Sequence, residues 1–529
     1  SRALKRLVSV VQVHLRPPLN MKKNFYHNKI FTIFNIFFVL LLFFPIATSL
    51  FYPIELEVRE STLWLHVLTL KSNVGLYDSS FVAYANHAHG PFDPIFKYFI
   101  SNIFSFLEPW QISRSSNLFF FISIYLTFFT ILKKYKFPIN SILFFASLFF
   151  SLILIFTKGY QGRADITALF LLIALIFVVI NFSLNSTIFR IFNPLLVALV
   201  ILTNWRFLPI VFSISLFFLL EDFVKKKYSI RKINVKKIVE YLFILTLVPI
   251  AILHLQFDFE LKKYYDYFFN FFYFESHFSS TYIKGGLTSL LKVEKFFVLI
   301  LFCVTIFYYF VIKGLLKRNV FPFYLTFFGI ILITIFQFLY NYNGGGIYYF
   351  TPVVLITFFL FFHTLKNFLF YNSILQKNKK IKYLLISLIF LIVINAGKFS
   401  AIASFKMITT YNNAQDLHLE LSRLNQHETL SESMHFQKKM FTGEKIDIGD
   451  LMSYRSSQVG GEYQKIYLDH IEDIKKKKYT YIIHNFTGSS IIGKLIKENK
   501  YRVVRTFKGS NFYSNTRDVL VLKKNVLSK

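Results

Sequence analysis

Residues 51–64 read FYPIELEVRESTLW, and residues 87–94 read HAHGPFDP. Both phrases belong to one polar stretch, residues 51–117, which separates the first long apolar run of the chain from the second. Because most of the remaining chain is apolar, a polar segment of this length between spans decides the fold class and is the first place to expect chemistry. Its carboxylates include Glu55, Glu57, Glu60, Asp78 and Asp93.

The composition indicates a membrane protein. Of 529 residues, 54% are hydrophobic, including 70 Phe and 32 Tyr, and the formal net charge is +32. Such a charge also suits a nucleic-acid-binding protein, but the Lys and Arg clusters fall between apolar runs, as in the cytoplasmic loops of membrane proteins. We therefore expect membrane lipids, including anionic ones, and no nucleic acid as partners. The single cysteine, Cys303, excludes a disulfide within the chain.

Long apolar runs predict about eleven spanning helices, since each helix needs about 20 residues to cross a bilayer. The runs lie near 31–50, 118–132, 140–156, 166–182, 187–203, 207–220, 239–254, 294–312, 321–340, 347–363 and 382–398. With this count, all the Lys and Arg clusters at span ends fall on one side of the membrane, which predicts a cytoplasmic N-terminus. Residues 51–117 and everything after residue 398 then lie on the outer side.

The two ends of the chain differ from its middle. Residues 1–20 favour Arg, Val and Pro over the Lys, Phe, Ile and Asn of the rest, so we expect the natural chain to start at Met21 and leave residues 1–20 out of the fold. Residues 21–399 are expected to form the transmembrane domain. Residues 400–529 lack the long apolar runs and are expected to form a soluble domain on the outer face.

The expected outer domain contains strand and helix patterns. Tyr479–His484 alternates as a strand does, and Val519–Leu522 is typical of a final strand. Ile491–Asn499 has the apolar spacing of a helix. Strands that alternate with a helix predict a small α/β domain. The predicted fold class is therefore a polytopic α-helical membrane protein with a small C-terminal α/β domain.

Glu60 is the leading candidate for chemistry in the first outer stretch. A carboxylate at the outer membrane boundary, beside a low-dielectric cavity, can act as a general base with a raised pKa. The alternative, which spacing alone favours, is a solvated glutamate at a helix start. The residues after Glu60 have the spacing of an amphipathic interfacial helix. Its apolar face would consist of Leu63, Trp64, Val67, Leu68 and Leu70.

The phrase at residues 87–94 places His87, His89 and Asp93 around a rigid Gly-Pro turn. A histidine on such a turn can hold a phosphate, and an ordinary polar loop is an equal alternative. His and Asp are also metal-ligand types, but their spacing matches no known metal site. We therefore assign no metal ligand.

Two more phrases lie at predicted outer boundaries. Arg163 and Asp165 open the fourth span, where Asp165 also suits a helix N-terminus that stabilises an anion by about 0.3–1 kcal/mol. Arg206 follows the fifth span and is either a snorkelling anchor or a phosphate ligand.

The order of these features resembles the GT-C glycosyltransferases, in particular bacterial aminoarabinose transferases, protein O-mannosyltransferases and lipopolysaccharide-core sugar transferases. The shared order is a first span, an outer loop with an acidic residue, the Gly75–Asp78 phrase, the His-Gly-Pro turn and an Arg-x-Asp phrase before span four. The resemblance covers most of the chain after Met21. It implies an enzyme of the bacterial inner membrane, active in cell-envelope glycan biosynthesis, with the C-terminal domain on the periplasmic or extracellular side.

The resemblance also implies roles for single residues. Glu60 stands before Gly75 at the interval that the family's catalytic carboxylate occupies, and Glu57 is a reserve because the family often has an Asp-Glu pair there. Asp165 matches a second acidic position of the family. The implied contacts to the donor phosphate are His89, Arg163 and Arg206. The implied substrate cavity contains Asp78, His87, Asp93, Tyr348 and Tyr349.

The implied reaction is an inverting displacement. A carboxylate deprotonates or orients an acceptor hydroxyl, and polyprenyl phosphate leaves from a polyprenyl-phosphate sugar donor. The acceptor is a lipid, a glycan or a protein. Some members of the family use a divalent metal ion and others do not, so no cofactor is assigned.

Three other functions compete with a transferase. A flippase for lipid-linked sugars would place ionisable residues within spans and show repeats between halves, whereas the ionisable residues here avoid the span centres. A polysaccharide polymerase or ligase would have its large outer loop late in the chain. A scaffolding membrane protein would not need carboxylates gathered on one face.

Overall fold

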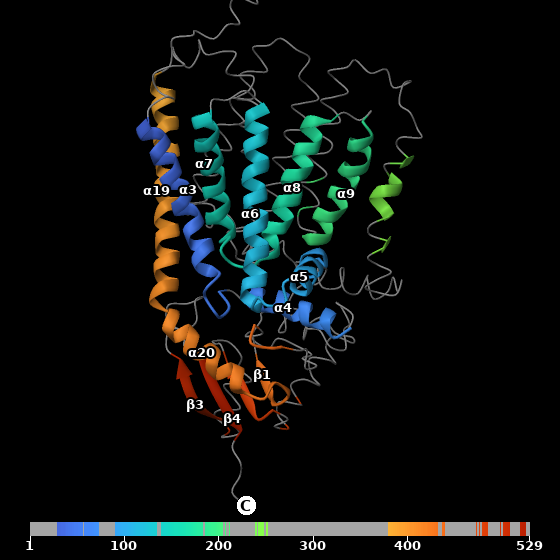
Figure 1. Ribbon diagram of the computed structural model, residues 1–529, viewed down its shortest axis with the longest axis vertical. Helices are drawn as coiled ribbons and strands as arrows, with labels where there is room; N and C mark the ends of the chain where they lie inside the picture. The colour runs from blue at the N-terminus through green and yellow to red at the C-terminus, as the bar shows by residue number, and fades with distance from the viewer. Residues whose placement is uncertain are drawn as a thin grey trace, which may run out of the picture.

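The structure is a computed structural model that describes the main helices and strands of the chain (Figure 1). The described residues are 29–56, 58–73, 90–134, 139–182, 186–204, 379–431, 436–439, 479–484, 501–507 and 519–524, with isolated positions and short runs between 207 and 251 and at 472, 476 and 498. Long helices stand side by side, and short helices and a small sheet lie at one end of them. The long helices are α3 (Lys29–Ser49), α6 (Pro109–Lys134), α7 (Ile139–Thr157), α8 (Ala164–Asn181), α9 (Thr187–Thr203) and α19 (Lys379–Thr409).

The apolar sequence of the long helices explains their packing. Among the described residues, Thr32–Ser49 and Pro109–Thr130 are long and apolar enough to cross a membrane, and α7, α8 and α9 contain shorter apolar stretches. The helices predicted near residues 31–50, 140–156, 166–182 and 187–203 are confirmed. The predicted spans between residues 252 and 378 lie outside the described residues, so the count of eleven stays a prediction.

Two helices are longer than the apolar runs predicted. Helix α6 begins at Pro109 rather than near residue 118, because its first two turns are a polar helical segment that is not exposed to lipid. Helix α19 continues past residue 398 to Thr409. Its extension brings Thr410 to the end of α3, where its hydroxyl lies 2.9 Å from the hydroxyl of Tyr52. The division of the chain at residue 400 stays a prediction.

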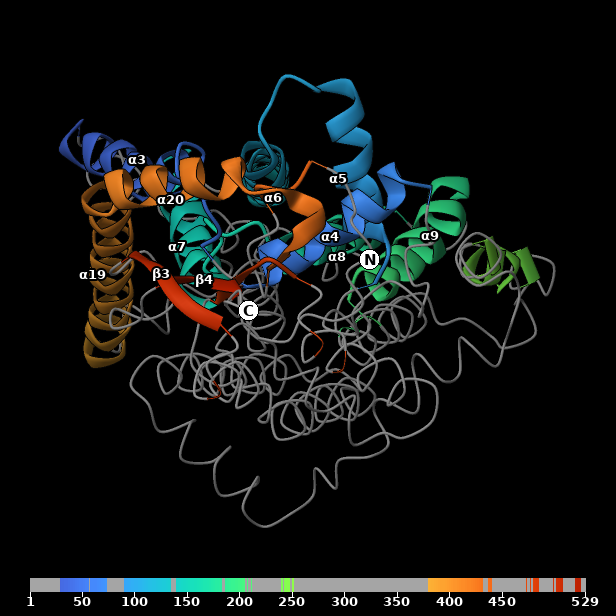
Figure 2. The same cartoon turned by 90° about the horizontal axis from the view of Figure 1, so that it is seen from below.

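Helices α4 (Val58–Lys71) and α5 (Phe92–Ile103) lie across the lower end of the long helices (Figures 1 and 2). The helix predicted after Glu60 is confirmed as α4, but the amphipathic face is wrong. Its polar residues Ser61, His66 and Thr69 are buried, as are all members of the predicted apolar face except the half-buried Leu70. The reason is that α4 packs between α5, α6 and Phe436, so nearly all of its described side chains are buried.

Helix α5 has an inverted pattern. Its polar residues Asp93, Lys97 and Ser101 are buried, whereas Phe99 is 61% exposed and Ile103 is 54% exposed. Phe106, just after the helix, is 78% exposed. A helix on the surface of a water-soluble protein would bury its apolar side chains and expose its polar ones. Exposed Phe on the outside and charge on the inside suit a helix at a membrane boundary that covers a polar centre.

The C-terminal part contains α20 (Tyr411–Arg423) and a four-stranded sheet. Helix α20 buries Ala414 and Leu417, and the ring of His418 packs edge-on against Trp110 at the start of α6, with 4.9 Å between centroids. This contact places the C-terminal part against the same end of the bundle as α4 and α5.

The sheet has the strand order β1-β2-β4-β3. Strand β1 (Thr429–Ser431) runs parallel to β2 (Tyr481–His484), and β4 (Val519–Lys524) pairs antiparallel with both β2 and β3 (Tyr501–Phe507). The strands predicted at 479–484 and 519–522 are confirmed, with β2 beginning at Tyr481. The predicted helix at 491–499 lies outside the described residues except for one turn position.

Gly90 provides a test of how α5 is attached to α9. Its N–H donates to the carbonyl of Thr203 at 2.8 Å, and a Cβ added to it would lie 1.7 Å from the carbonyl oxygen of Leu202. Gly90→Ala must therefore push two backbones apart. We expect it to lower the free energy of unfolding by roughly 1–3 kcal/mol, seen as a lower melting temperature in detergent.

Gly397→Ala is the matched control for Gly90→Ala. Gly397 lies within α19, where an added Cβ would meet only the end of the Leu41 side chain, at 3.3 Å. Alanine is a better helix former than glycine by about 1 kcal/mol, so this change should leave the melting temperature equal or higher. Equal melting of the two variants would contradict the close approach at Gly90.

Candidate functional site

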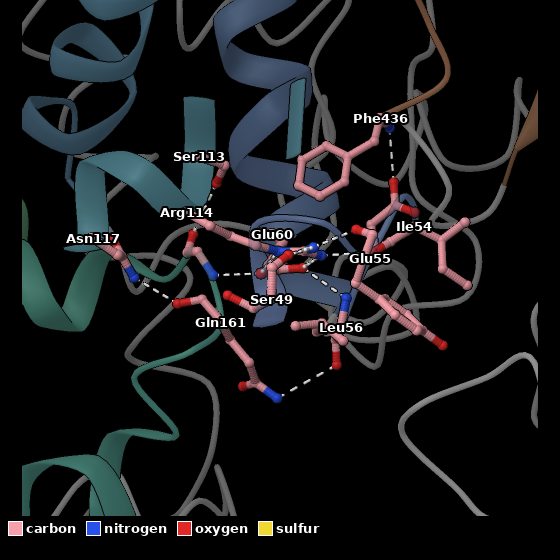
Figure 3. Close-up of polar contacts among 12 residues, drawn as sticks. Ser49, Ile54, Glu55, Leu56, Glu60, Ser113, Arg114, Asn117, Gln161 and Phe436 are labelled. Atoms are coloured by element: carbon pink, nitrogen blue, oxygen red, sulfur yellow. Dashed lines mark hydrogen bonds and ion pairs between the residues drawn. The ribbon is translucent and has the colours of Figure 1, made fainter. Parts of the chain in front are cut away.

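A buried ion pair between Glu60 and Arg114 forms the centre of the polar region (Figure 3). Glu60 lies in the first turn of α4 and is 0% exposed, and Arg114 lies near the start of α6 and is 1% exposed. The pairing is bidentate: Nε of Arg114 donates to Oε1 of Glu60 at 3.1 Å, and Nη2 donates to Oε2 at 3.0 Å. A planar guanidinium matches a carboxylate in this fork geometry.

Arg114 uses all five of its N–H donors. Besides the two bonds to Glu60, Nη1 donates to the carbonyls of Ser49 and Tyr52 at 2.6 and 2.5 Å. Nη2 also donates to the carbonyl of Ile54 at 2.5 Å. The first two acceptors belong to the end of α3 and the turn after it, where a helix leaves carbonyls without intrahelical partners. Arg114 therefore fastens the end of α3, the following loop and α4 to α6.

Glu60 accepts four hydrogen bonds, two on each oxygen. In addition to the bonds from Arg114, Oε2 accepts from the N–H of Leu56 at 2.7 Å, and Oε1 accepts from the N–H of Gly162. An ionised carboxylate offers about four lone-pair positions. All of them are filled, which is the pattern of an ionised carboxylate with no position left for a further donor.

Gly162 joins this pair to a second charged group. Its N–H donates to Glu60, while its carbonyl accepts from Nζ of Lys97 at 2.8 Å. Lys97 forms an ion pair of 2.8 Å with Asp93 one turn earlier in α5, and the hydroxyl of Thr167 in α8 donates to Asp93. A side chain at position 162 would place its Cβ 2.2 Å from Oγ of Ser113, so any larger residue there would require the Ser113 hydroxyl to turn away.

A third ion pair opens α8. Nε of Arg163 donates to Asp165 at 2.9 Å, and the side-chain amide of Asn204, just after α9, donates to the other oxygen of Asp165 at 3.1 Å. Arg163 and Asp165 are both buried. Asp165 lies in the first turn of α8, as the capping alternative predicted, but its resolved partners are side chains of the polar centre.

Glu55 differs from the other buried carboxylates. It is 3% exposed, its Oε1 accepts from the backbone N–H of Phe436 at 2.7 Å, and its Oε2 is buried without a hydrogen-bond partner. Burial raises the pKa of Glu55 to about 7. The backbone N–H groups of Phe436 and of Glu55 itself oppose this effect, as does Arg114, whereas the nearby charge of Glu60 adds to it. The contact joins the first outer stretch to a residue 381 positions away in the chain.

The structure brings four of the predicted site residues to one end of the helix bundle: Glu60, Asp93, Arg163 and Asp165. The other predicted residues lie outside the described part of the chain, and their roles stay predictions. These are Glu57, Asp78, His87, His89, Arg206, Tyr348 and Tyr349. In the described ranges, no group of three or more His, Cys, Asp and Glu side chains has the arrangement of a metal site.

Sequence reasoning missed Arg114, Lys97 and Gly162. A signal for Arg114 was present: residues 111–117 read QISRSSN, a polar run that leads directly into an apolar run. Polar residues at the head of a spanning helix indicate that this turn faces protein rather than lipid. Lys97 gave no comparable signal, because a single lysine among aromatic residues is equally typical of an interfacial helix.

Comparison with solved structures identifies the fold. ArnT from Cupriavidus metallidurans bound to undecaprenyl phosphate matches with a TM-score of 0.56 and 11% sequence identity, covering 94% of this chain and 99% of that one. The apo state of ArnT from the same organism matches with a TM-score of 0.51 and 10% identity, covering 93% and 98%. This chain has the fold of ArnT.

The ArnT fold is that of a polytopic helical membrane protein, and ArnT is an aminoarabinose transferase of the GT-C type. The predicted resemblance to GT-C enzymes is therefore confirmed at the level of the fold. No protein-family model and no curated protein sequence matches the chain. At 10–11% identity the likeness to ArnT establishes the fold alone.

Arg114→Lys tests the importance of the central ion pair. A lysine keeps the charge but has three donors on one nitrogen, so it leaves several of the five acceptors of Arg114 unpaired. We expect the free energy of unfolding to fall by roughly 3–5 kcal/mol, measured by thermal melting in detergent. Arg505→Lys is the matched control, because Arg505 pairs with Glu420 on the surface of the C-terminal part. A surface pair contributes only about 0–1 kcal/mol, and equal losses in both variants would contradict the central role of Arg114.

Glu55→Gln tests the raised pKa. The ordinary value is 4.5, so between pH 4.5 and about 7 the folded state keeps the Glu55 proton that the unfolded state has released. The contribution of Glu55 to stability is therefore fully present below pH 4.5 and falls by roughly 3 kcal/mol as pH rises through 7. Glutamine does not titrate. We therefore expect the melting temperature of the variant, relative to that of the wild type, to rise between pH 4.5 and 7 and then level off. A difference in melting temperature that stays constant with pH would contradict the raised pKa of Glu55.

Proposed function

We propose that the chain is a membrane glycosyltransferase that takes a sugar from a polyprenyl-phosphate donor. The observation that carries this proposal is the fold: it matches ArnT over nearly the whole of both chains, and one of these ArnT structures is bound to undecaprenyl phosphate. The acceptor is a lipid, glycan or protein of the cell envelope. The enzyme lies in the bacterial inner membrane with its N-terminus in the cytoplasm and the polar centre at the outer face.

The position of the charged groups supports a transferase over a flippase. Glu60, Arg114, Lys97, Asp165 and Arg163 lie in short helices or at the ends of the long ones. A flippase needs ionisable groups along a path through the membrane. A set of charges confined to one end of the bundle suits chemistry at one membrane face.

The proposed reaction is a single inverting displacement. The acceptor hydroxyl gives its proton to a carboxylate, and its oxygen bonds to the anomeric carbon of the sugar. The bond from that carbon to the phosphate oxygen breaks, and polyprenyl phosphate leaves with the electron pair. Cationic groups that stabilise the developing negative charge lower the barrier. Arg206, His89 and Arg163 are proposed for that role, and a carboxylate of residues 51–117 or Asp165 takes the proton.

Binding of undecaprenyl phosphate tests the proposed donor class. We expect this lipid, added to the purified protein in nanodiscs, to raise the melting temperature, since a ligand at 100 times its Kd stabilises the folded state by about 2.7 kcal/mol. Undecaprenol, which lacks the phosphate, should give a much smaller rise. Arg206→Ala should reduce the effect of the phosphate, whereas Arg505→Ala should not. Equal effects of the two lipids on the wild type would refute the phosphate site.

A further inference from the structure

Glu60 is too fully bonded to take the proton of an acceptor hydroxyl. Its four acceptor positions are filled by Arg114, Leu56 and Gly162. A hydroxyl at Glu60 would have to displace one of these N–H groups and leave it buried without a partner, which costs about 1–3 kcal/mol for each group. With these four bonds, Glu60 fixes the positions of the segments around it.

The structure held by Glu60 and Arg114 is the backbone on either side of Glu55. The carbonyl of Ile54 accepts from Arg114 at 2.5 Å, and the N–H of Leu56 donates to Glu60 at 2.7 Å. The carbonyl of Leu56 also accepts from the side chain of Gln161 at 3.4 Å. Both peptides that flank Glu55 are thus fixed to buried side chains. A side chain on such a rigid frame is held in a defined geometry, as a reacting group must be.

The side chain of Glu55 is held by one oxygen only. The N–H of Phe436 fixes Oε1, while Oε2 is buried without a hydrogen-bond partner (Figure 3). A buried polar atom without a partner costs free energy and calls for an explanation. The pKa of about 7, caused mainly by burial, is that of a group that accepts and releases protons near neutral pH.

We propose that Oε2 of Glu55 takes the proton from the acceptor hydroxyl, and that Glu60, Arg114 and the N–H of Phe436 are positioning groups. This inference rests on the proposed transferase function. In the displacement, the hydroxyl proton moves to Oε2 of Glu55 as the acceptor oxygen bonds to the anomeric carbon and polyprenyl phosphate leaves. Glu55 then releases the proton to water. Glu60, predicted as the catalytic carboxylate, takes a positioning role.

The C-terminal segment Phe436–Lys439 completes the site. The ring of Phe436 packs against the guanidinium of Arg114, with 5.6 Å from Cζ to the ring centroid, and edge-on against Trp64 at 6.2 Å. Gln437 and Lys438 are buried as well. Glu55 is 3% exposed and contacts this segment through the Phe436 N–H, so an acceptor reaches Oε2 only when part of the surrounding structure moves. The charged groups that act on Glu55 are Glu60 from α4 and Arg114 from α6.

Kinetics of Glu55→Gln test the proposal. Undecaprenyl-phosphate aminoarabinose and undecaprenyl-phosphate mannose serve as donors for the enzyme in native membrane lipids, with protein amounts matched. Loss of a general base lowers kcat by about 10²–10⁴-fold, and we expect this loss with an unchanged melting shift by undecaprenyl phosphate. Glu55→Asp should retain part of the activity. Glu108→Gln is the matched control, because Glu108 is an exposed carboxylate just before α6 and should keep wild-type transfer.

The pH profile separates a base from a structural group. Wild-type kcat should rise with pH up to about 7 and then level off, and the residual activity of Glu55→Gln should lack this rise. Infrared spectra provide a measurement that needs no sugar: the wild type should show a protonated carboxyl band that disappears near pH 7, and Glu55→Gln should lack it.

The outcomes distinguish this inference from the function on which it rests. If the wild type transfers neither sugar and undecaprenyl phosphate does not stabilise it, the proposed function fails and the role of Glu55 fails with it. If the wild type transfers sugar but Glu55→Gln keeps its rate and pH profile, only the role of Glu55 is overturned. Loss of the lipid-induced melting shift in Glu55→Gln, or absence of the titrating infrared band in the wild type, also overturns it.

Discussion

The bidentate pair of Arg114 and Glu60 is the interaction on which the rest of the polar centre depends. Removing two charges from water is costly, and the cost is offset only when every donor and acceptor finds a partner. Here five N–H groups of Arg114 and four acceptor positions of Glu60 are all used. The same guanidinium also bonds to the carbonyl of Ser49 at the end of α3 and to those of Tyr52 and Ile54 in the following loop. A single pair thereby fixes the relative positions of three helices and the loop between them.

The backbone of Gly162 connects this ion pair to a second one. Gly162 connects Glu60 on its N–H side to Lys97 on its carbonyl side, so the charges of α4 and α5 meet across the segment that enters α8. Helix α5 then presents Asp93 and Lys97 inward and Phe99 outward. In a low-dielectric surrounding, unpaired members of such a network would be far less stable than paired ones, which explains why no charge in it stands alone.

The sequence was sufficient for the long helices and for two strands, because apolar runs and strict alternation are local signals. It was also sufficient to find the polar stretch with Glu60 and the phrase with Asp165. The sequence did not predict the contacts that join segments far apart in the chain. Nothing near Glu55 indicates that Phe436 will bond to it, and nothing near Gly162 indicates that Ser113 will lie against it. Glu60 lies at the centre of the polar region, but its four hydrogen bonds depend on Arg114 and Gly162, which follow it by 54 and 102 residues.

The contact between Glu55 and Phe436 has a consequence for biosynthesis. Arg114 follows Glu60 by 54 residues, so their pair can form while most of the protein is still to be made. Phe436 emerges 381 residues after Glu55, which at about 5–20 residues per second is a delay of roughly 20–80 s. The frame around Glu55, which includes Gln161 and Gly162, can form during that interval, before Phe436 is available. Glu55 therefore lacks its hydrogen bond from Phe436 until the C-terminal part has begun to be synthesised.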